Sequence, residues 1–537
     1  MSEPHASLVK IKDAPPVQLF QGYDTFMSAG RSTAVTGTSK ISGAASETYY
    51  KVCSNFETLQ KTLHISSAVS ASFGFGSVDL KGEFLRGLEV TNTSITIVVY
   101  TSIVTGVETV TNVRWVDTPP KEINAFFQAY GDCYLNELTS GAEYIATYVF
   151  YSQSVEEQNQ ISAALAANGI STSGSLDATL QTRLSAVQKQ VTTRSSLRQY
   201  MRGVANESFP ESDGIIKFAL SFGSREIKQP YVISYRATGY EHVPHMPASF
   251  ETVVTTRALY DGVGGQDGLD ENYATLSAVK NAAEAMIKIY DTYDYIGDEN
   301  LSNNYALVRR DLETLDHLFY AMDRDPTRAY SRPALPALTL GSPKLEVALK
   351  VHGPWGGHGG HPFRQVTEAS VSKALVLSEL SIRGGRWVDQ LSSTYASRSE
   401  PTEKTVFKQG GLGGSESPTL MLQSNERVTA VSGRFDIVYV YQLKVTAANK
   451  TQESSLTWPL HEVSFTAPLS FHWKPEGSEV FLGFAGRSDL FVNAISVVSA
   501  TFFPARWLPY DRTKPRIDAG PLEISAVDGE RAVTSRH

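Results

Sequence analysis

Apolar and polar residues alternate in two parts of the amino-terminal half, as they do in strands with one buried face. The stretch Ser94–Thr111 is rich in β-branched residues and predicts a long strand in a sheet core. Tyr144–Phe150 predicts a second strand, and it follows an apolar segment with helical spacing that begins at Ile123. Sheet and helix are therefore both expected in this half.

Residues 65–84 alternate between apolar side chains on one face and small, polar or charged side chains on the other. About ten such residues let a tilted strand cross a bilayer, and the charges of this segment all lie on the face that would line water. The pattern therefore predicts an amphipathic membrane hairpin. A helix is also permitted by the spacing from Phe56 onward, and a soluble sheet with one wet face is a further alternative. The apolar face consists of Ile65, Val69, Phe73, Phe75, Val78, Leu80 and Phe84.

Residues 176–191 satisfy two periods at once, because the same apolar residues form a helical stripe and one face of an extended chain. A segment that is helical in storage and extended after insertion needs this double compatibility. Asn168-Gly169, just upstream, is a two-residue hairpin signal. A plain surface helix that ends near Arg202 is the alternative. The leucines concerned are Leu176, Leu180 and Leu184.

Residues 271–322 predict two helices whose apolar stripes face a core. A change of composition at Ser331–Lys344 predicts a semi-rigid, proline-rich linker. Short strands punctuated by glycine follow, and residues 509–537 are expected to form a poorly ordered tail. The stripes are Leu276, Val279, Ala283, Met286 and Tyr290, and then Val308, Leu312, Leu315, Phe319 and Met322.

The composition is that of a globular protein with more than one domain: 537 residues, 41% hydrophobic and 19% charged. A net charge of -8 gives no reason to expect nucleic acid as a partner. The sequence has no run of eighteen apolar residues and no recognisable signal peptide, so we expect a protein that is soluble in the producing cell. Cys53 and Cys133 are too few for a disulfide framework and are expected to be buried thiols.

No pattern in the chain predicts catalysis or a cofactor. The sequence contains no Gly-x-Ser-x-Gly elbow, no phosphate-binding loop and no His-Glu-x-x-His. The acidic residues between Asp261 and Glu271 lack calcium-loop spacing. His352, His358 and His361 lack the spacing and the fourth ligand of a zinc site. We expect neither an enzyme nor a metal site.

The segment Tyr130-Gly131-Asp132-Cys133-Tyr134 is followed, after six residues, by Gly141-Ala142. It resembles the signature of the membrane-attack-complex/perforin (MACPF) superfamily, which is Tyr-Gly-Thr-His-(Tyr/Phe), six residues, Gly-Gly. Asp132, Cys133 and Ala142 depart from that pattern. Small residues here let a sheet bend and let backbones approach closely. An ordinary helix-loop-strand junction is the alternative. Gly22-Tyr23-Asp24 is similar to a turn near the start of such domains.

The MACPF resemblance implies an α+β domain over residues 1–330, with a bent antiparallel sheet of four long strands and two helical clusters. The clusters, at about 54–93 and 155–203, would be the segments that this superfamily converts into membrane hairpins. Open sheet edges are costly in lipid, so such hairpins must close into a barrel, which requires a ring of identical subunits. The implied strands are Thr48–Cys53, Ser94–Thr111, Gly141–Ser154 and Gly214–Tyr240.

The carboxy-terminal region carries two glycine-rich stretches, 353–360 and 410–414, and a weak internal repeat in which 385–391 aligns with 489–495. These features resemble a jacalin-related lectin, which implies an all-β, three-sided β-prism over residues 345–508. In that family a sugar lies between a Gly-Gly loop and a Gly-x-x-x-Asp loop.

The resemblance implies one candidate carbohydrate site and one degenerate site. Backbone N–H groups at glycine approach a hydroxyl closely, and a carboxylate accepts two sugar hydroxyls. Asn493 and Asp489 break the pattern in the degenerate site. A purely structural turn is the alternative for the first site. The first candidate is Gly385, Arg386, Trp387 and Asp389 with Gly413 and Gly414, where Trp387 would add a stacking face; the degenerate one is Gly360, Asp489, Leu490, Phe491 and Asn493.

The combined domains resemble insecticidal perforin-like proteins that carry a β-prism. This resemblance implies a pore-forming toxin or defence protein that acts at a target cell membrane. Its partners would be a glycan or glycoprotein receptor and, in the active ring, further copies of the chain. The alternative is a non-lytic carbohydrate-binding defence protein that uses the same folds.

Overall fold

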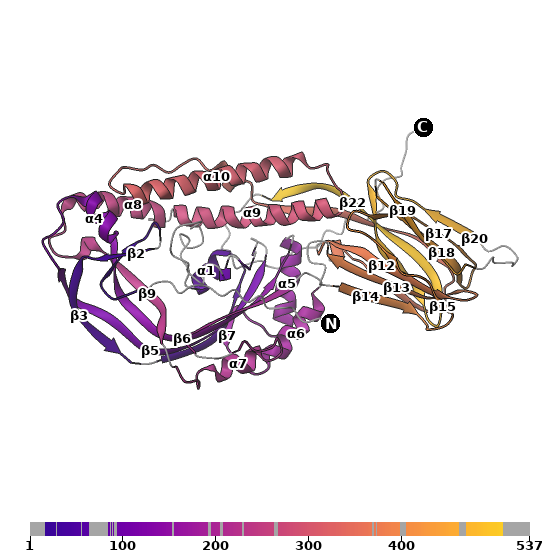
Figure 1. Cartoon of the computed structure of the whole chain (residues 1–537), viewed down its shortest axis with the longest axis horizontal. Helices are drawn as coiled ribbons and strands as arrows, with labels where there is room; N and C mark the ends of the chain where they lie inside the picture. The colour runs from indigo at the N-terminus through magenta and orange to yellow at the C-terminus, as the bar shows by residue number, and fades with distance from the viewer. Residues whose placement is uncertain are drawn as a thin grey trace.

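The computed structural model contains an amino-terminal α+β domain and a carboxy-terminal β-prism, arranged along one long axis (Figure 1). It describes residues 17–508 except 28, 44, 55, 64–83, 86, 89, 91–93, 153–154, 192–194, 205–207, 228–229, 263–266, 368–369, 372, 398–403, 450 and 461–468.

The amino-terminal domain is built on a nine-stranded antiparallel sheet. Its path runs β2-β1-β6-β5-β4-β7; β3 pairs with β5, and β8 and β9 pair with different halves of β6. The two longest strands, β5 and β6, form the middle of the sheet, which curves strongly (Figure 1). The strands are β1 (Gln21–Asp24), β2 (Ala29–Thr33), β3 (Val35–Ser42), β4 (Ala45–Cys53), β5 (Ile95–Trp115), β6 (Cys133–Phe150), β7 (Ser173–Ser175), β8 (Ser195–Arg202) and β9 (Tyr231–Gly239).

Gly141 lies at an irregularity of the sheet, where the pairing of β6 with both β5 and β9 shifts register. A Cβ atom at Gly141 would overlap the carbonyl oxygen of Ile103. A second glycine, Gly203, has φ +88° and approaches Gly141 from the end of β8, so that a Cβ there would lie 2.6 Å from the Gly141 carbonyl oxygen. The predicted close approach of backbones at Gly141 is confirmed, and Gly203 adds to it.

The sheet prediction is wrong over the first half of Gly214–Tyr240, where helix α7 (Ile215–Phe222) precedes β9. Ile215, Ile216, Ala219 and Phe222 are all buried, which is the spacing of a helix that packs one face on a core. The third strand also begins earlier than Gly141 and ends at Phe150. Residues 22–24 form strand β1 rather than a turn, because they pair with β2 and β6.

The first helical cluster contains α1 (Phe56–Leu63). Most of the predicted membrane hairpin that follows, including Ile65, Val69, Phe73, Phe75, Val78 and Leu80, lies outside the described residues. Phe84 is described, and its ring lies 5.8 Å from that of Tyr200.

The second cluster contains α5 (Val155–Ala167), β7 and α6 (Leu180–Gln190). The predicted helix ends at Gln190 rather than near Arg202, since the chain then returns to the sheet as β8. Asn168-Gly169 ends α5 and forms no hairpin: Gly169 has φ +70°, and the N–H groups of residues 168–170 donate back to the last carbonyls of the helix.

Helices α8 (Glu251–Asp261), α9 (Leu269–Thr292) and α10 (Glu299–Arg324) lie along the concave side of the sheet (Figure 1). Both predicted apolar stripes are confirmed, because all ten of their side chains are buried. The short helix α4 (Ile123–Tyr130) precedes β6, and 3₁₀ turns occur at η1 (Tyr240–His242), η2 (Ala248–Phe250) and η3 (Pro336–Thr339).

The predicted linker, Ser331–Lys344, is packed against α10 rather than free. Ala337 is fully buried, and its N–H donates to the Asp311 carboxylate (2.8 Å). The last residues of the segment already belong to β10. The apolar side chains between the prolines explain this packing, since Leu335 and Ala337 join the core of the amino-terminal domain.

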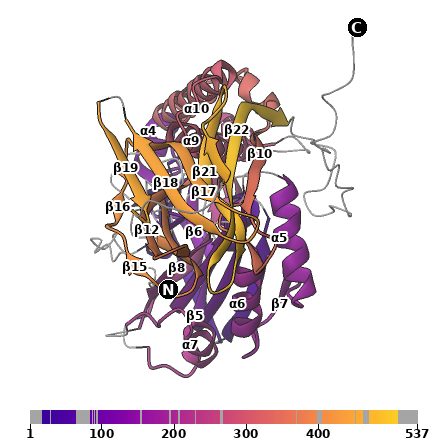
Figure 2. The same ribbon diagram turned by 90° about the vertical axis from the view of Figure 1, so that its right-hand side faces the viewer.

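Three antiparallel sheets form the sides of the predicted β-prism, which lies in front in Figure 2. Their orders are β10-β22-β21-β11, β14-β13-β12-β15 with β16 on β12, and β19-β18-β17-β20. The strands are β10 (Ser342–Gly356), β11 (His361–Arg364), β12 (Leu375–Gly384), β13 (Val388–Ser397), β14 (Lys404–Gly410), β15 (Ser415–Glu416), β16 (Leu420–Met421), β17 (Arg427–Phe435), β18 (Val440–Ala448), β19 (Glu453–Trp458), β20 (Leu469–Trp473), β21 (Glu479–Ser488) and β22 (Val492–Leu508).

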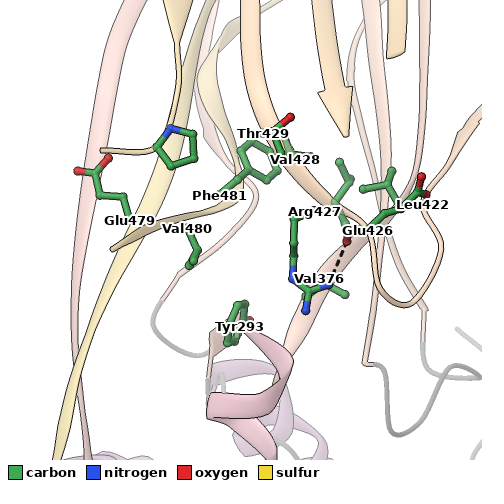
Figure 3. A pocket seen from close by; sticks show the side chains of 12 residues that line it. Tyr293, Val376, Leu422, Glu426, Arg427, Val428, Thr429, Glu479, Val480 and Phe481 are labelled. Atoms are coloured by element: carbon green, nitrogen blue, oxygen red, sulfur yellow. Dashed lines mark hydrogen bonds between the residues drawn. The ribbon is translucent and has the colours of Figure 1, made fainter. Parts of the chain in front are cut away.

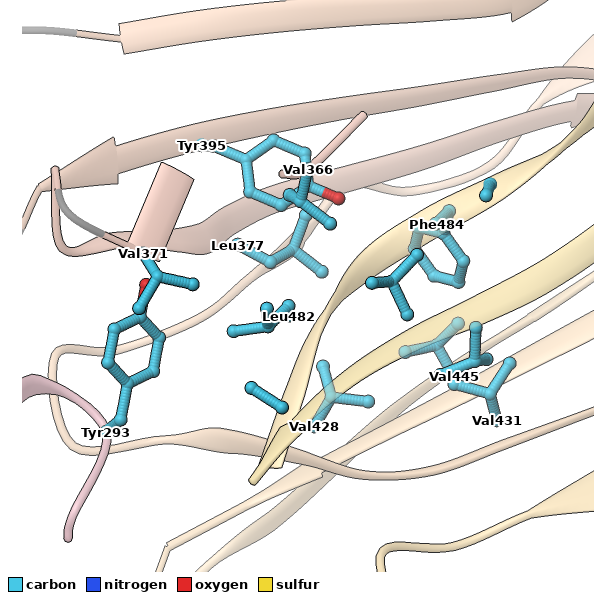
Figure 4. Close-up of a cluster of buried hydrophobic side chains, with 14 of the residues drawn as sticks. Tyr293, Val366, Val371, Leu377, Tyr395, Val428, Val431, Val445, Leu482 and Phe484 are labelled. Atoms are coloured by element: carbon cyan, nitrogen blue, oxygen red, sulfur yellow. The ribbon is translucent and has the colours of Figure 1, made fainter. Parts of the chain in front are cut away.

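The end of α9 is part of the core of the prism (Figure 4). The hydroxyl of Tyr293 donates to the carbonyl oxygen of Leu375 (2.7 Å), and its ring stacks on Phe502 with centroids 4.9 Å apart. Arg427 of β17 donates to the carbonyl oxygen of Thr292 (2.9 Å). A mainly apolar cavity of about 150 Å³ opens beside this contact (Figure 3). The prism is therefore packed firmly against the helical layer.

Candidate functional site

Two pairs of loops at the end of the prism away from α9 share one backbone arrangement. In the first pair, loop 410–414 lies against the turn between β12 and β13; in the second, loop 356–360 lies against the turn between β21 and β22. Gly410 and Gly356 both have positive φ (+108° and +133°), as do Gly414 and Gly360 (+61° and +69°). The internal repeat that the sequence predicts is therefore a structural repeat.

Asp389 is the centre of the first loop pair. Its side chain is 6% exposed and accepts a hydrogen bond from the Gly385 N–H (3.0 Å). A Cβ on Gly413 would lie 2.5 Å from one carboxylate oxygen, and a Cβ on Gly414 would lie 2.7 Å from the other. Both glycines are thus needed for the carboxylate to lie so close to the loop. Burial raises the pKa of Asp389, and the Gly385 N–H opposes this shift.

The structure brings Gly385, Asp389, Gly413 and Gly414 together, as the resemblance implies. Arg386 is exposed, and its guanidinium lies 5.0 Å from the centre of the Trp387 ring. We call these six residues the Asp389 site.

The ring of Trp387 packs against two other aromatic rings, so it is less available for stacking on a sugar than an isolated surface ring would be. Its ring centre lies 5.2 Å from Tyr439 and 5.2 Å from Phe491, which are themselves 5.2 Å apart. Each ring comes from the turn of a different sheet of the prism. The three aromatic residues therefore close this end of the prism, and we call them the aromatic triad.

Asn493 takes the place of Asp389 in the second loop pair. A Cβ on Gly360 would lie 2.5 Å from its Oδ1 atom, which is buried and finds no hydrogen-bond donor in the described part of the chain. Asp489 is exposed and its N–H donates to the Phe491 carbonyl oxygen, closing the turn. The geometry of the first pair is thus kept, but the carboxylate is replaced by an amide.

Two arginines of this region are missing from the sequence-based candidates. Arg383 donates to the carbonyl oxygens of Gly413 (3.4 Å) and Gly414 (3.2 Å) and pairs with Glu416 (3.0 Å). Arg487 holds the other loop in the same way, through the carbonyl oxygens of Gly359 (3.0 Å) and Gly360 (2.7 Å). Extending the repeat two residues toward the amino terminus aligns these arginines and would have found them.

The family model described as "Jacalin-like lectin domain" matches residues 352–498. The carboxy-terminal domain is jacalin-like. A related sequence is horcolin from Hordeum vulgare subsp. vulgare, 28% identical over 151 residues, which are 27% of this chain and 91% of horcolin. Two similar solved structures are wild-type Malaysian banana lectin (20% identity, 29% of this chain and 99% of that chain, TM-score 0.22) and AcmJRL, a mannose-binding jacalin-related lectin from Ananas comosus (21%, 29% and 99%, TM-score 0.22).

These matches cover the jacalin-like domain and less than a third of the chain. The sites of the amino-terminal domain therefore depend on its own geometry. Two of its features were predicted to carry function: the pair of helical clusters and the segment around Tyr130.

Both helical clusters connect strands at one end of the sheet. Segment 54–94 joins β4 to β5, and segment 151–194 joins β6 to β8. Register places Cys53 opposite Thr96, Ile95 opposite Phe150, and Phe150 opposite Ser195. The four strands β4, β5, β6 and β8 are therefore adjacent and antiparallel, and both segments leave from the same end of the sheet.

The second cluster rests on the sheet through the apolar face predicted for it. Leu180, Leu184 and Val187 are fully buried and pack with Tyr144 and Tyr148 of β6. From the same cluster, β7 pairs with the outer edge of β4, with Lys51 opposite Ser173. That edge is thus covered in this state.

The segment around Tyr130 joins α4 to β6. Gly131 has φ +77°, and a Cβ there would overlap the backbone of Tyr23. Tyr134 is buried, with its ring 5.6 Å from that of Tyr240. Asp132, which departs from the superfamily pattern, is fully buried.

The carboxylate of Asp132 ties together elements that are distant in sequence. It accepts from the N–H and the hydroxyl of Thr25 (2.9 Å each) and pairs with Arg257 of α8 (3.2 Å). Neighbouring Cys133 is a buried free thiol, like Cys53, as predicted. Burial raises the pKa of both thiols, that of Cys53 to about 11.

Among the described residues, no helix is long and apolar enough to span a membrane. The same part of the chain contains no cluster of three or more potential metal ligands. His352 lies on β10 beside Ser499 (2.9 Å), and His361 lies on β11.

Proposed function

We propose that this chain is a pore-forming, insecticidal protein of the MACPF type. In this proposal the jacalin-like domain binds a glycan on the target membrane through the Asp389 site. The protein then assembles into a ring, and each subunit inserts two amphipathic hairpins.

The attachment of both helical clusters to one end of four adjacent strands carries the proposal. Each connecting segment is about 40 residues long, which allows it to cross a bilayer twice with strands of ~10 residues. If both segments became extended, they would prolong β4, β5, β6 and β8 without changing the order of the strands. The double period of residues 176–191 supports the same change.

A ring of subunits can close a β-barrel, which one chain cannot do. Four extended strands leave two open edges, and unpaired backbone groups in lipid are costly, so several subunits must close one barrel. The edge of β4 is paired with β7 here. In our proposal β7 leaves this edge when the second cluster unfolds, and a neighbouring subunit takes its place.

A disulfide between β4 and β7 tests the proposal directly. Lys51 and Ser173 are directly opposite in register, and opposite residues of antiparallel strands lie within disulfide range. We expect the Lys51→Cys/Ser173→Cys variant to release no dye from liposomes of target-membrane lipids when oxidised, and to release it fully after reduction.

The matched control is Thr446→Cys/Ser455→Cys, which links β18 to β19 in the prism at another directly opposite pair. Oxidation of the control should leave dye release unchanged. If the oxidised β4–β7 variant released dye as fast as the reduced one, the second cluster would not need to leave the sheet, and the proposed mechanism would be wrong.

The second candidate function is carbohydrate binding without lysis. The match of residues 352–498 to a lectin family favours it, because that match requires nothing of the amino-terminal domain. A glycan array combined with dye release separates the two functions. Glycan binding without release, on membranes that carry the bound glycan, would support the second candidate.

A further inference from the structure

Four large aliphatic side chains project from the end of the prism that carries the Asp389 site. Their exposed fractions are 79% for Leu412, 81% for Ile437, 43% for Val438 and 70% for Leu490. Leu412 belongs to loop 410–414, Leu490 to the turn between β21 and β22, and the other two to the turn between β17 and β18. We call these four residues the aliphatic tip.

The loops at this end of the prism touch one another. The N–H of Gly411 donates to the Leu490 carbonyl oxygen (3.1 Å). A Cβ on Gly357 would lie 2.5 Å and 2.6 Å from the carbonyl oxygens of Val438 and Ile437. Beneath them lies the aromatic triad, of which Tyr439 and Phe491 come from turns that carry the tip and Trp387 comes from the turn between β12 and β13. The exposed side chains therefore stand on a packed base.

We propose that the aliphatic tip enters the interfacial layer of a lipid bilayer, so that the Asp389 site binds a saccharide held at the membrane surface, as in a glycolipid. The inference rests on the proposed function for its choice of a membrane-bound glycan. Direct contact between the tip and lipid is additional to that function and can be tested alone.

The chemistry of the tip favours lipid over a protein partner. Protein interfaces concentrate aromatic residues and arginine in a buried centre. Here the aromatic residues lie below the surface, and the exposed apolar side chains on the separate loops are all aliphatic, beside the exposed Arg386 and Asp489. Exposed apolar groups gathered at one place mark interaction sites, and groups that reach a short way into the headgroup boundary anchor proteins at a membrane surface.

The position of the tip agrees with a membrane at this end of the molecule. Helices α5 and α6 lie at the end of the amino-terminal domain that faces the prism (Figure 1). The strand ends at Cys53, Ile95, Phe150 and Ser195 lie beside them. A bilayer that the tip touches would thus lie on the side toward which the two segments would extend.

The aliphatic tip and the Asp389 site are also adjacent in the chain. Leu412 directly precedes Gly413 and Gly414, which lie against the Asp389 carboxylate. A saccharide bound to Asp389 would be next to Leu412. The bound saccharide and the inserted Leu412 would therefore both lie at the surface of the membrane.

A fluorescent label at residue 437 tests the inference. Cys53 and Cys133 are buried, so an environment-sensitive thiol label reports only on the new cysteine of Ile437→Cys. With glycan-free phosphatidylcholine vesicles we expect a blue shift and quenching by brominated acyl chains. The control is Val406→Cys on the side of the prism, where Val406 is also exposed; its label should stay in water.

A serine variant gives the matching binding measurement. Leu412→Ser/Ile437→Ser/Leu490→Ser should float with phosphatidylcholine vesicles at least tenfold less than the unchanged protein. Its melting temperature and its binding of a soluble glycan should not change. The control is Val351→Ser/Val406→Ser/Met421→Ser, three exposed apolar residues on the sides of the prism, which should float normally.

The outcomes separate this inference from the proposed function. If the protein releases dye while the label at residue 437 stays in water, the tip does not enter lipid and the inference is wrong, although pore formation stands. If the label is quenched by lipid but no dye is released under any condition, the inference that the tip enters lipid stands, and the proposed pore formation is wrong. Loss of binding to an immobilised, lipid-free glycoprotein in the serine variant would show a protein-binding surface and overturn the inference.

Discussion

The two loop pairs of the jacalin-like domain differ in one decisive side chain. Both have an arginine that holds the glycine loop, Arg383 in one and Arg487 in the other. Asp389 lies in the first pair and accepts the Gly385 N–H, whereas the Oδ1 atom of Asn493 accepts no hydrogen bond from the described residues. The second pair thus keeps its shape without a carboxylate.

This comparison bears on the view that Asp389 is only part of a structural turn. The turn between β21 and β22 closes with the Asp489 N–H on the Phe491 carbonyl oxygen (2.9 Å), and the turn between β12 and β13 has the same bond from Gly385 to Trp387 (3.2 Å). Since the turn forms with Asn493, the buried carboxylate of Asp389 is not required for it. A buried carboxylate needs hydrogen-bond donors, and in our proposed function sugar hydroxyls supply them at Asp389.

The largest effect is expected when the first pair is made to resemble the second. Asp389→Asn removes the charge that strengthens hydrogen bonds to two sugar hydroxyls. Hydrogen bonds to charged groups contribute about 1.5–3 kcal/mol each, so the loss of two should weaken binding about a hundredfold or more. Titration calorimetry with the strongest ligand from a glycan array measures it.

Asn493→Ala is the control for this change, because we expect it to leave glycan affinity unchanged. The fold should survive in Asp389→Asn, as it does around Asn493, and circular dichroism would verify that. Equal affinities for Asp389→Asn and the unchanged protein would remove Asp389 from the site.

The reverse change should create a second site. Asp489→Gly/Asn493→Asp restores the pattern of the first pair in a loop pair whose backbone already matches it. We expect the number of glycans bound per chain to rise from one to two in calorimetry. A stoichiometry that stays at one, in a folded variant, would mean that the matching backbone is insufficient and that Arg386 or another residue peculiar to the first pair is needed.

A smaller effect is expected from one methyl group beside the carboxylate. The Cβ of Gly413→Ala would lie 2.5 Å from an oxygen of Asp389, so the carboxylate must move. We expect glycan binding to weaken about tenfold, since a displaced carboxylate loses roughly one of its charged hydrogen bonds. Gly359→Ala is the matched control in the second pair, where the Cβ would lie 3.0 Å from Asn493. Similar losses in both variants would show that the loops act through general stability.

How far the sequence predicts the structure depends on the range of the contacts. The stripes of α9 and α10 and the long strand from Ile95 were predictable because each repeats a clear period over many residues. The repeat around Asp389 and Asn493 was visible because two turns of the prism share their geometry. Periodicity and local repetition are properties that one chain reveals by itself.

Other features depend on contacts that no local pattern encodes. The residues of α7 are apolar enough for strand or helix, and burial of one face against Tyr144 decides the matter. Arg383 and Arg487 act on backbone carbonyls, which have no sequence signature. Nothing in the sequence around Tyr293 distinguishes it from other residues at helix ends, because its role depends on contacts with the prism, which is distant in sequence.

The smallest effect on glycan affinity is expected from a change of pH. Its direction should be opposite to the direction of the effect on folding stability. Burial raises the pKa of Asp389 above the ordinary value of 3.8. Glycan binding needs the ionised carboxylate, so affinity should fall severalfold as pH is lowered from 7 toward 4, starting at a higher pH than an ordinary aspartate would give.

The raised pKa has the opposite effect on folding: the contribution of Asp389 to stability is fully present below the pKa of the unfolded chain and is lost as pH rises through the folded pKa. The pH dependence that Asp389 contributes should therefore have opposite signs in calorimetric titrations and in melting temperatures, and Asp389→Asn should remove that contribution from each. A decrease of melting temperature in parallel with affinity on acidification, unchanged in Asp389→Asn, would place the titrating group elsewhere in the domain.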